Sequence, residues 1–309
     1  MKRICVYLAA AFLAIISATY YTLPHYFREP LIELNRGIAG LEEKTILVDR
    51  HEIHYLEGGS GDAVVLLHGI FAEKDHWVDF ARPLTGSYHV IVPDLPGFGE
   101  SSRMPDLQYD YAAQTELLVK MLDKLGIKRA HLAGNSMGGT IASLFAIKYP
   151  DRVASIAFIG APHGIRSTTP SEMDMLIDAG KAPLVARNPA EFEEMLSLVF
   201  AKRPFLPFPI IQASQSSAIN NAESNHRIWL GQLKDRYLLH ERIETLKHKT
   251  LVLWGENDRV FDVSGAGVLK AKLSRAEMHV LHGIGHLPMM EAPKDTSGLY
   301  TAFLRKMKS

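Results

Sequence analysis

One short stretch constrains this chain more than any other: residues Gly134–Gly138, which spell Gly-Asn-Ser-Met-Gly. Residues 130–133 before it are largely apolar, as in a buried strand, and residues 139–147 after it fit a helix. A strand that turns sharply into a helix at a serine is a nucleophile elbow, which exposes the hydroxyl above the sheet at the positive end of the helix. The sequence therefore predicts that Ser136 is a nucleophile. A glycine-rich turn with a purely structural role is the alternative.

The sequence around this elbow alternates between strand-like and helical patterns. Predicted strands cover residues 45–48, 53–56, 63–67, 89–92, 130–133, 153–159, 250–254 and 278–281. Predicted helices cover residues 77–84, 111–125, 139–147 and 299–307. Repeated strand–helix units imply a mainly parallel, eight-stranded sheet that is covered by helices on both faces.

The alternation stops after Gly160 and resumes near residue 241. We predict that residues 161–240 are mostly helical and form a cap, and that residues 44–160 and 241–309 form the core. Open α/β sheets bind ligands at the carboxyl ends of their strands, so a cap at that edge would cover the site. The cap contains strongly apolar pieces, which suggest an acyl-binding lid. Ordinary internal packing is the alternative explanation for these pieces.

The N-terminus has a different character from the rest of the chain. Residues 4–23 carry no formal charge, and about 20 helical residues span a hydrocarbon core of roughly 30 Å. We therefore expect a transmembrane anchor over residues 1–23 and a juxtamembrane segment over residues 24–43; a cleaved signal peptide is the alternative. Lys2 and Arg3 predict a cytoplasmic N-terminus, which sends the remaining chain across the membrane.

Two patterns in this region predict contacts. Small residues recur every four positions in the anchor, which lets two helices approach closely and suggests a homodimer: Ala10, Ala14 and Ala18. The frequency of alanine in such helices is the alternative explanation.

In the juxtamembrane segment, apolar residues at helical spacing predict a short helix: Leu31, Leu34, Ile38 and Leu41. This helix would lie on the bilayer surface or pack on the domain.

Composition excludes several classes of function. The formal net charge is zero and there is no long run of Lys or Arg, which argues against nucleic acid as a partner. Cys5 is the single cysteine, so the chain forms no internal disulfide and no thiolate metal site. Neither the His-Glu-x-x-His pattern of zinc enzymes nor the Gly-x-Gly-x-x-Gly pattern of dinucleotide sites occurs. We expect no metal and no cofactor.

A nucleophilic serine needs a base and an acid that orients the base, and in this architecture the acid precedes the histidine. Asp258 follows the predicted strand at 250–254, and His286 follows the next predicted strand. We predict that Asp258 is the orienting acid and His286 the base. Rival acids are Glu256 and Asp262, and rival bases are His279 and His282.

The tetrahedral intermediate of acyl transfer needs donors for its oxyanion. One predicted donor is the backbone N–H of Met137, which follows the nucleophile. The other is the N–H of Ile70, with its neighbour Phe71 as the alternative, in a loop that we expect His68 to brace. Two further residues at strand ends are expected to be structural: Asp94 and His163.

With these elements in order, the chain resembles the α/β-hydrolase superfamily over residues 44–309. Residues 68–77 (HGIFAEKDHW) are similar to the H-G-F-x-x-x-K-D-x-W segment of bacterial family V lipases and membrane-anchored monoacylglycerol lipases, and residues 94–101 and 254–258 fit the same group. With its N-terminal anchor, the chain looks most like the bacterial membrane-anchored phospholipases A. Ile70 departs from the usual Phe, which changes the pocket but not a backbone donor.

This resemblance implies an α/β-hydrolase fold with a mostly helical cap. It also implies a serine carboxylester hydrolase that acts on phospholipids, lysophospholipids or acylglycerols through an acyl-enzyme, at the bacterial inner membrane with the catalytic domain on the periplasmic side. One alternative is a C–C bond hydrolase of ring-cleavage products, which shares the Gly134–Gly139 motif. Another is a lipid-binding receptor without activity. Such receptors often lack a triad residue, whereas all three are present here.

Overall fold

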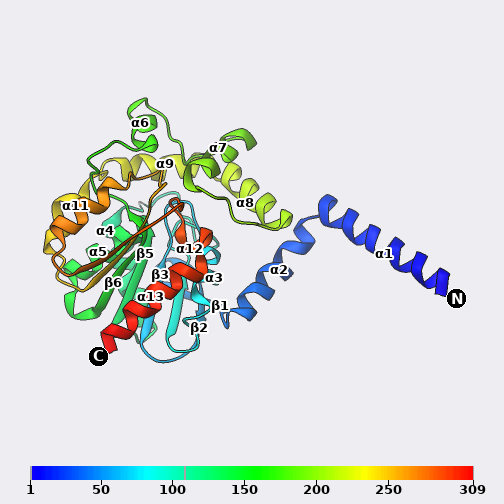
Figure 1. Ribbon diagram of the computed structural model, residues 1–309, viewed down its shortest axis with the longest axis horizontal. Coiled ribbons are helices and arrows are strands. Elements are labelled where there is room, and N and C mark those ends of the chain that lie inside the picture. Colours follow the sequence, from blue (N-terminus) through cyan, green and yellow to red (C-terminus); the bar gives the residue numbers. More distant parts are fainter. Residues whose placement is uncertain (1, 108, 309) are drawn as a thin grey trace.

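The computed structural model describes residues 2–107 and 109–308, apart from the side chains of residues 2 and 3. A sheet with helices on both faces forms the body, and a long N-terminal helix projects away from it (Figure 1). The strands are β1 (Glu42–Val48), β2 (His51–Gly58), β3 (Ala63–Leu67), β4 (His89–Pro93), β5 (Ala130–Ser136), β6 (Val153–Pro162), β7 (Thr250–Gly255) and β8 (Ala276–Leu281).

The strands form one eight-stranded sheet in the order β1-β2-β4-β3-β5-β6-β7-β8. β1 pairs with β2, and β2 with β4, in antiparallel register. All pairs from β4 to β8 are parallel, which confirms the predicted mainly parallel sheet. Because the parallel strands share one direction, the segments that follow β5, β7 and β8 meet at the same edge. Helices cover both faces of β5 and β7, so these strands are buried throughout.

Helices cover each face of the sheet and bury a separate apolar cluster there. One face carries α4 (Tyr111–Lys124), α5 (Met137–Lys148) and α11 (Ser264–Lys272), and the other carries α3 (Val78–Ala81), α12 (Pro288–Glu291) and α13 (Pro293–Lys308) (Figure 1). The helix predicted at 77–84 is shorter than expected. A 3-10 turn, Lys74–Trp77, precedes α3, and α3 ends at Ala81 because Pro83 has no N–H to extend it.

Between β6 and β7 the chain is helical, as the sequence predicts. The helices are α6 (Glu172–Asp178), α7 (Pro189–Val199), α8 (Phe208–Asn220), α9 (Ala222–Leu233) and α10 (Leu238–Arg242). A 3-10 turn, Ile243–Thr245, follows α10, and another, Pro150–Arg152, precedes β6. Local sequence sets where two of them begin. Ser171 forms a capping box with Asp174, and Asn188 caps α7 ahead of Pro189. These helices lie over one end of the sheet (Figure 1).

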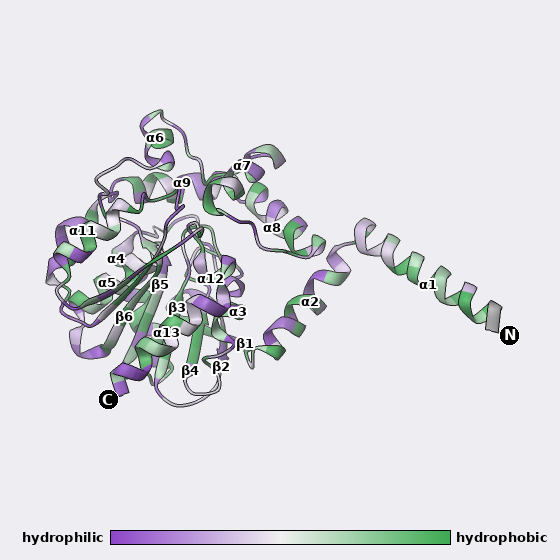
Figure 2. Ribbon diagram, viewed as in Figure 1, coloured by the Kyte–Doolittle hydropathy of each residue, from purple (hydrophilic) through white to green (hydrophobic). Residues whose placement is uncertain are grey.

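The N-terminal helix α1 (Lys2–Thr22) fits a membrane anchor. Its segment Ile4–Thr22 is long and apolar enough to cross a membrane, and it is not buried against the body. Apolar residues recur along most of its length (Figure 2). The predicted orientation depends on the side chains of Lys2 and Arg3, which lie outside the described part of the chain. The cap reaches this region through α8, because the Phe208 N–H donates to the Tyr20 hydroxyl at 3.1 Å.

The juxtamembrane helix α2 (His25–Ile38) is longer than predicted. It starts earlier and continues through Pro30. Of the predicted apolar stripe, Leu34 and Ile38 are 61% and 60% exposed and Leu41 is buried, and Ile32 and Arg36 are buried as well. The reason is electrostatic: the Arg36 guanidinium binds the Asp75 carboxylate through two hydrogen bonds of 2.7 and 2.6 Å, which turns that face of the helix inward.

Candidate active site

The predicted elbow is present where β5 runs directly into α5. Ser136 stands at the junction with φ of +51°, a backbone conformation that non-glycine residues adopt rarely. Gly134 makes the turn feasible: a Cβ there would lie 2.3 to 2.5 Å from the backbone of Gly138 and Gly139. The strand and the helix therefore approach more closely than any side chain would allow, and Ser136 is held at the end of the strand.

Asp258 and His286 lie in the loops after β7 and β8, and the fold brings them together. His286 Nδ1 lies 2.8 Å from Asp258 Oδ2, and the two side chains are 5% and 0% exposed. The other carboxylate oxygen, Oδ1, accepts from the N–H groups of Val260 and Phe261 at 2.9 Å each. An acceptor facing Nδ1 favours the tautomer in which Nδ1 carries the proton and Nε2 can accept one.

Ser136 and His286 line the same cavity. Within the described part of the chain, Ser136 Oγ forms no hydrogen bond of its own. In ligand-free serine hydrolases such contacts are often long and tighten with substrate. The Asn135 amide connects the strand that ends at Ser136 to the loop that carries His286. Its Nδ2 donates to the carbonyl oxygens of His286 and Ile159 at 2.9 Å each. Sequence reasoning missed Asn135; the available signal was an amide in a strand that is otherwise apolar.

The rival acids and bases do not line the cavity. His282 is almost fully exposed and pairs with Glu256 at 2.5 Å. Asp262 Oδ1 accepts from the Ser264 N–H and so starts α11. His279 lies within β8, where Nε2 faces Glu277 at 3.1 Å. All four have structural or surface partners of their own.

The loop after β3 packs directly against Ser136. A Cβ at Gly69 would meet Asn135 Oδ1 at 3.0 Å and Ser136 Cβ at 3.2 Å. Ile70 and Phe71 follow it and line the cavity, and Phe71 has φ of +58°. Neither the Ile70 nor the Phe71 N–H donates to another described residue. Met137 is the first residue of α5, where helical N–H groups have no partner within the helix.

His68 braces this loop, as the sequence suggested. Its Nε2 accepts from the Leu95 N–H at 2.9 Å, so Nδ1 carries the proton and donates to the Gly69 carbonyl at 2.7 Å. Burial lowers the pKa of His68, which keeps this ring neutral, as one donor and one acceptor require. The ring therefore couples the loop after β3 to the loop after β4.

A buried ion pair holds the same loop from its far end. Lys74 Nζ lies 2.9 Å from Asp94 Oδ2, and the Lys74 N–H donates to Asp94 Oδ1 at 2.6 Å. Nζ also contacts the Glu100 carboxylate. Burial alone would lower the pKa of Lys74, but the charges of Asp94, Glu100 and Asp75 raise it overall. Asp94 is thus structural, as predicted. His163 also has a hydrogen-bond partner, because its Nδ1 lies 2.6 Å from the Tyr111 hydroxyl.

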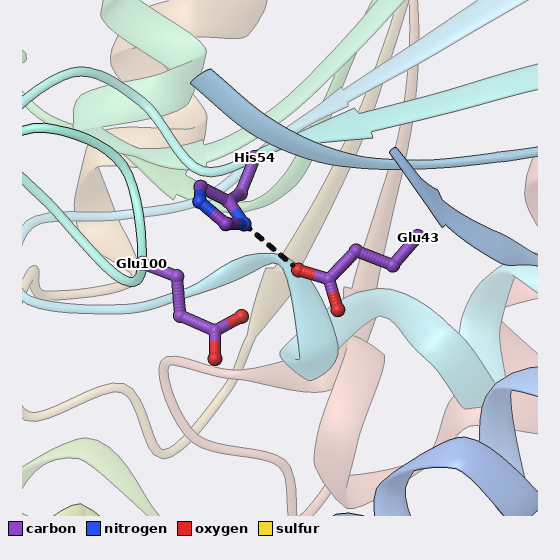
Figure 3. A group of neighbouring side chains, drawn as sticks. All are labelled: Glu43, His54 and Glu100. Atoms are coloured by element: carbon purple, nitrogen blue, oxygen red, sulfur yellow. Dashed lines mark hydrogen bonds and ion pairs between the residues drawn. The ribbon is translucent and has the colours of Figure 1, made fainter. Parts of the chain in front are cut away.

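Glu43, His54 and Glu100 gather beside this ion pair in a geometry that resembles a set of metal ligands (Figure 3). His54 Nδ1 lies 3.1 Å from Glu43 Oε1. Both carboxylates already have cationic partners, however. Arg36 binds Glu43, and Lys74 binds Glu100 and lies 3.4 Å from Glu43. The cluster is therefore best described as an ion network that joins α2 to the loop carrying Ile70 and Phe71.

The cavity beside Ser136 has a volume of about 1200 Å³, counting its open mouth. Its apolar wall comes largely from the cap and α12, and includes Phe192, Met195, Leu196, Val199, Ile211 and Met290. Its polar residues include Glu73 and His76, whose pKa values shift in opposite directions because burial disfavours both charges. The pKa of Glu73 rises to about 7, helped by Asp94 and Asp75, and that of His76 falls to about 4.

Ser136 also lines a second, smaller cavity of about 520 Å³. It shares Ile70, Ser136 and Leu184 with the first cavity. Its remaining apolar lining includes Met173, Ile177, Trp229 and Phe261. Both cavities are therefore lined by Ser136 and by the helical segment between β6 and β7.

The sequence and the structure of this chain are similar to those of known proteins. The model of the alpha/beta hydrolase fold family matches residues 62–293. Lipase 1 of Psychrobacter immobilis is 31% identical over 282 residues, which cover 89% of this chain and 88% of that protein. Monoacylglycerol lipase ABHD6 of Mus musculus is 31% identical over 257 residues, covering 80% and 76%. A crystal structure of a membrane phospholipase A, a bacterial virulence factor, is 38% identical with a TM-score of 0.90 and covers 100% of both chains.

Proposed function

The chain belongs to the alpha/beta hydrolase family, and we propose that it is a serine carboxylester hydrolase acting on membrane-derived acyl lipids. The observation that carries this proposal is the hydrogen bond between Asp258 and His286, formed at the same sheet edge as the strained Ser136 and beside an apolar cavity. The names of the relatives support the choice of lipid esters: lipase, monoacylglycerol lipase and phospholipase A.

In the proposed mechanism, His286 Nε2 takes the Ser136 proton as Oγ attacks the ester carbonyl carbon. Asp258 holds the imidazole and stabilises its positive charge. The N–H groups of Met137 and Ile70 stabilise the oxyanion, with Phe71 as the alternative second donor. The intermediate collapses when the C–O bond to the alcohol breaks and His286 gives its proton to the leaving oxygen. Water, activated by His286, then hydrolyses the acyl-enzyme and releases the fatty acid.

The proposed location is the bacterial cytoplasmic membrane, with α1 as a single span, the N-terminus in the cytoplasm and the catalytic domain on the outer side. The length and hydropathy of α1 support the span. We also propose a homodimer through the exposed small-residue row of Ala10, Ala14 and Ala18. Ala14→Leu should reduce the yield of crosslinked dimer in membranes, and an unchanged yield would remove the dimer from the account.

Hydrolysis by purified full-length protein in detergent tests the proposed activity. The substrates are a monoacylglycerol, a lysophospholipid, a diacyl phospholipid and a ring-cleavage dienoate. We expect turnover of acyl esters that Ser136→Ala abolishes, while Ser197→Ala, an exposed serine on α7, retains it. Turnover of the dienoate alone would favour the C–C hydrolase alternative, and ester turnover that survives in Ser136→Ala would refute the proposed nucleophile.

A further inference from the structure

The cavity beside Ser136 has a polar patch that the ester chemistry does not use. Arg103 lies in the loop between β4 and α4, Asn225 lies on α9, and Asn221 lies where α8 meets α9, and all three line the cavity. The wall contributed by α7 is apolar by contrast. A lipid that places its ester at Ser136 therefore has an apolar surface for an acyl chain and a separate polar surface within the same cavity.

Arg103 is partly buried and differs in its surroundings from Arg36, which is buried. Arg36 is surrounded by carboxylates, whereas no carboxylate of the described residues forms an ion pair with Arg103. Among the described residues, its side chain forms one hydrogen bond, from Nη1 to Asn225 Oδ1 at 2.7 Å. Burial lowers the pKa of Arg103, and the nearby charge of Arg227 lowers it further. A partly buried cation without a counter-ion is costly, so the site is suited to an anionic group that a ligand brings.

The geometry around Arg103 leaves donors available for such a group. The hydrogen bond to Asn225 uses one of the five guanidinium N–H bonds. Asn225 is 4% exposed, and its amide Nδ2 donates to no described residue. The planar guanidinium matches phosphate oxygens in a two-pronged hydrogen bond. Asn225 therefore both holds the guanidinium and adds a donor beside it.

The two halves of a lipid ester would carry different anions. The fatty acid product has its carboxylate at Ser136, where the ester is cleaved. The phosphodiester of a glycerophospholipid belongs to the alcohol half, which must lie along a different part of the cavity from the acyl chain. Since the apolar wall suits the acyl chain, the polar patch is left for the alcohol half.

We propose that Arg103, held by Asn225, binds the phosphodiester of a glycerophospholipid while its ester lies at Ser136, and that this contact makes the protein favour phospholipids and lysophospholipids over neutral acylglycerols. The inference rests on the proposed ester hydrolysis and names the substrate class of the same site. Arg103 acts on substrate choice and takes no part in bond breaking.

The test compares two substrates with the same oleoyl chain, 1-oleoyl-lysophosphatidylcholine and 1-oleoylglycerol, in one detergent. The measured quantity is the ratio of their kcat/KM values. Arg103→Gln should lower this ratio at least about tenfold, the effect of losing a charge-assisted hydrogen bond. Arg103→Lys keeps the charge but loses the two-pronged hydrogen bond of the guanidinium. Its kcat/KM ratio should therefore lie between those of the unmodified protein and Arg103→Gln. Arg305→Gln removes an exposed charge on α13, outside the cavity lining, and should leave the ratio unchanged.

Each outcome decides the matter. An unchanged ratio in Arg103→Gln, whether or not both rates fall, would overturn the headgroup site. If Arg103→Gln instead relieves inhibition by oleate and leaves the ratio unchanged, the anion bound is the product carboxylate and the proposal is wrong. If Arg103→Gln does not fold, a ratio in Arg103→Lys equal to that of the unmodified protein overturns it. Absence of turnover of both substrates by the unmodified protein would refute the ester hydrolase itself.

Discussion

The sheet edge and the helical cap build the same cavity in different ways. At the sheet edge, hydrogen bonds fix the position of each polar group: the Asp258 carboxylate accepts three of them, and Asn135, next to Ser136, binds the His286 carbonyl. The cap contributes apolar side chains from α7 and α8 that are held by packing alone. Phe205, in the loop between these two helices, is 91% exposed. The contrast separates the reaction from the selection of the acyl chain: we expect the fixed polar atoms beside Ser136 to act on the ester bond, and the apolar surfaces of the cap to select the acyl chain.

The largest predicted effect is at the sheet edge. Asp258→Asn should lower kcat by about 10³- to 10⁴-fold on every ester, because an amide favours the wrong tautomer of His286. Steady-state hydrolysis of a short and a long acyl ester measures the change. Asp262→Asn, four residues further on, should stay within about twofold, since the Asp262 side chain accepts only the Ser264 N–H at the start of α11 and a neutral amide still accepts that bond. Equal losses in the two variants would make Asp258 a structural residue.

A smaller effect is predicted at Glu73, on the cavity wall between the two regions. Its folded-state pKa of about 7 lies above the ordinary value of 4.5, so the folded protein holds this proton more tightly. The folded state therefore loses stability through this group as pH rises from about 4.5 to 7. At about 1.4 kcal/mol per pKa unit, Glu73→Gln should stabilise the protein by up to about 3 kcal/mol at pH 8 and have little effect near pH 4.

Urea unfolding followed by tryptophan fluorescence at both pH values checks this prediction. Glu194→Gln, an exposed residue on α7, is the matched control and should change stability equally little at pH 4 and pH 8. A difference for Glu73→Gln that is the same at the two pH values would show that Glu73 ionises like an exposed glutamate.

The smallest effect is predicted in the cap. Ile211 on α8 lines the cavity and is only partly buried, so Ile211→Trp should narrow the apolar part with little harm to packing. The ratio of kcat/KM for a long-chain to a short-chain p-nitrophenyl ester should fall at least about threefold, since one methylene in an apolar pocket is worth 10-fold or more. Leu230→Trp, on the exposed side of α9, should leave the ratio unchanged. Identical ratios in both variants would mean that the acyl chain lies elsewhere.

The same contrast explains what the sequence could predict. Strands such as β3 and β5 and the Gly134–Gly138 turn depend on local patterns, and these predictions agree with the structure. Asp258 and His286 were placed by their positions after strands, and the sheet then brings them together.

The features that the sequence did not predict depend on partners far away in the chain. Arg36 binds a carboxylate 39 residues away, and that bond holds the Arg36 face of α2 against the body. Arg103 meets its amide partner 122 residues away, in a cap whose packing no local pattern defines. Asn135 lies within the motif, but its hydrogen bond to the His286 carbonyl could not be predicted, because the fold alone brings these two residues together.

The most direct test of the central claim is to locate a covalent adduct. Full-length protein is treated with a fluorophosphonate, digested, and analysed by peptide mass spectrometry, alongside His286→Ala and the surface control His282→Ala. The account predicts one adduct, on Ser136, in the unmodified protein and in His282→Ala, and its near-complete loss in His286→Ala. An adduct on a different residue, or equal labelling of Ser136 without His286, would contradict it.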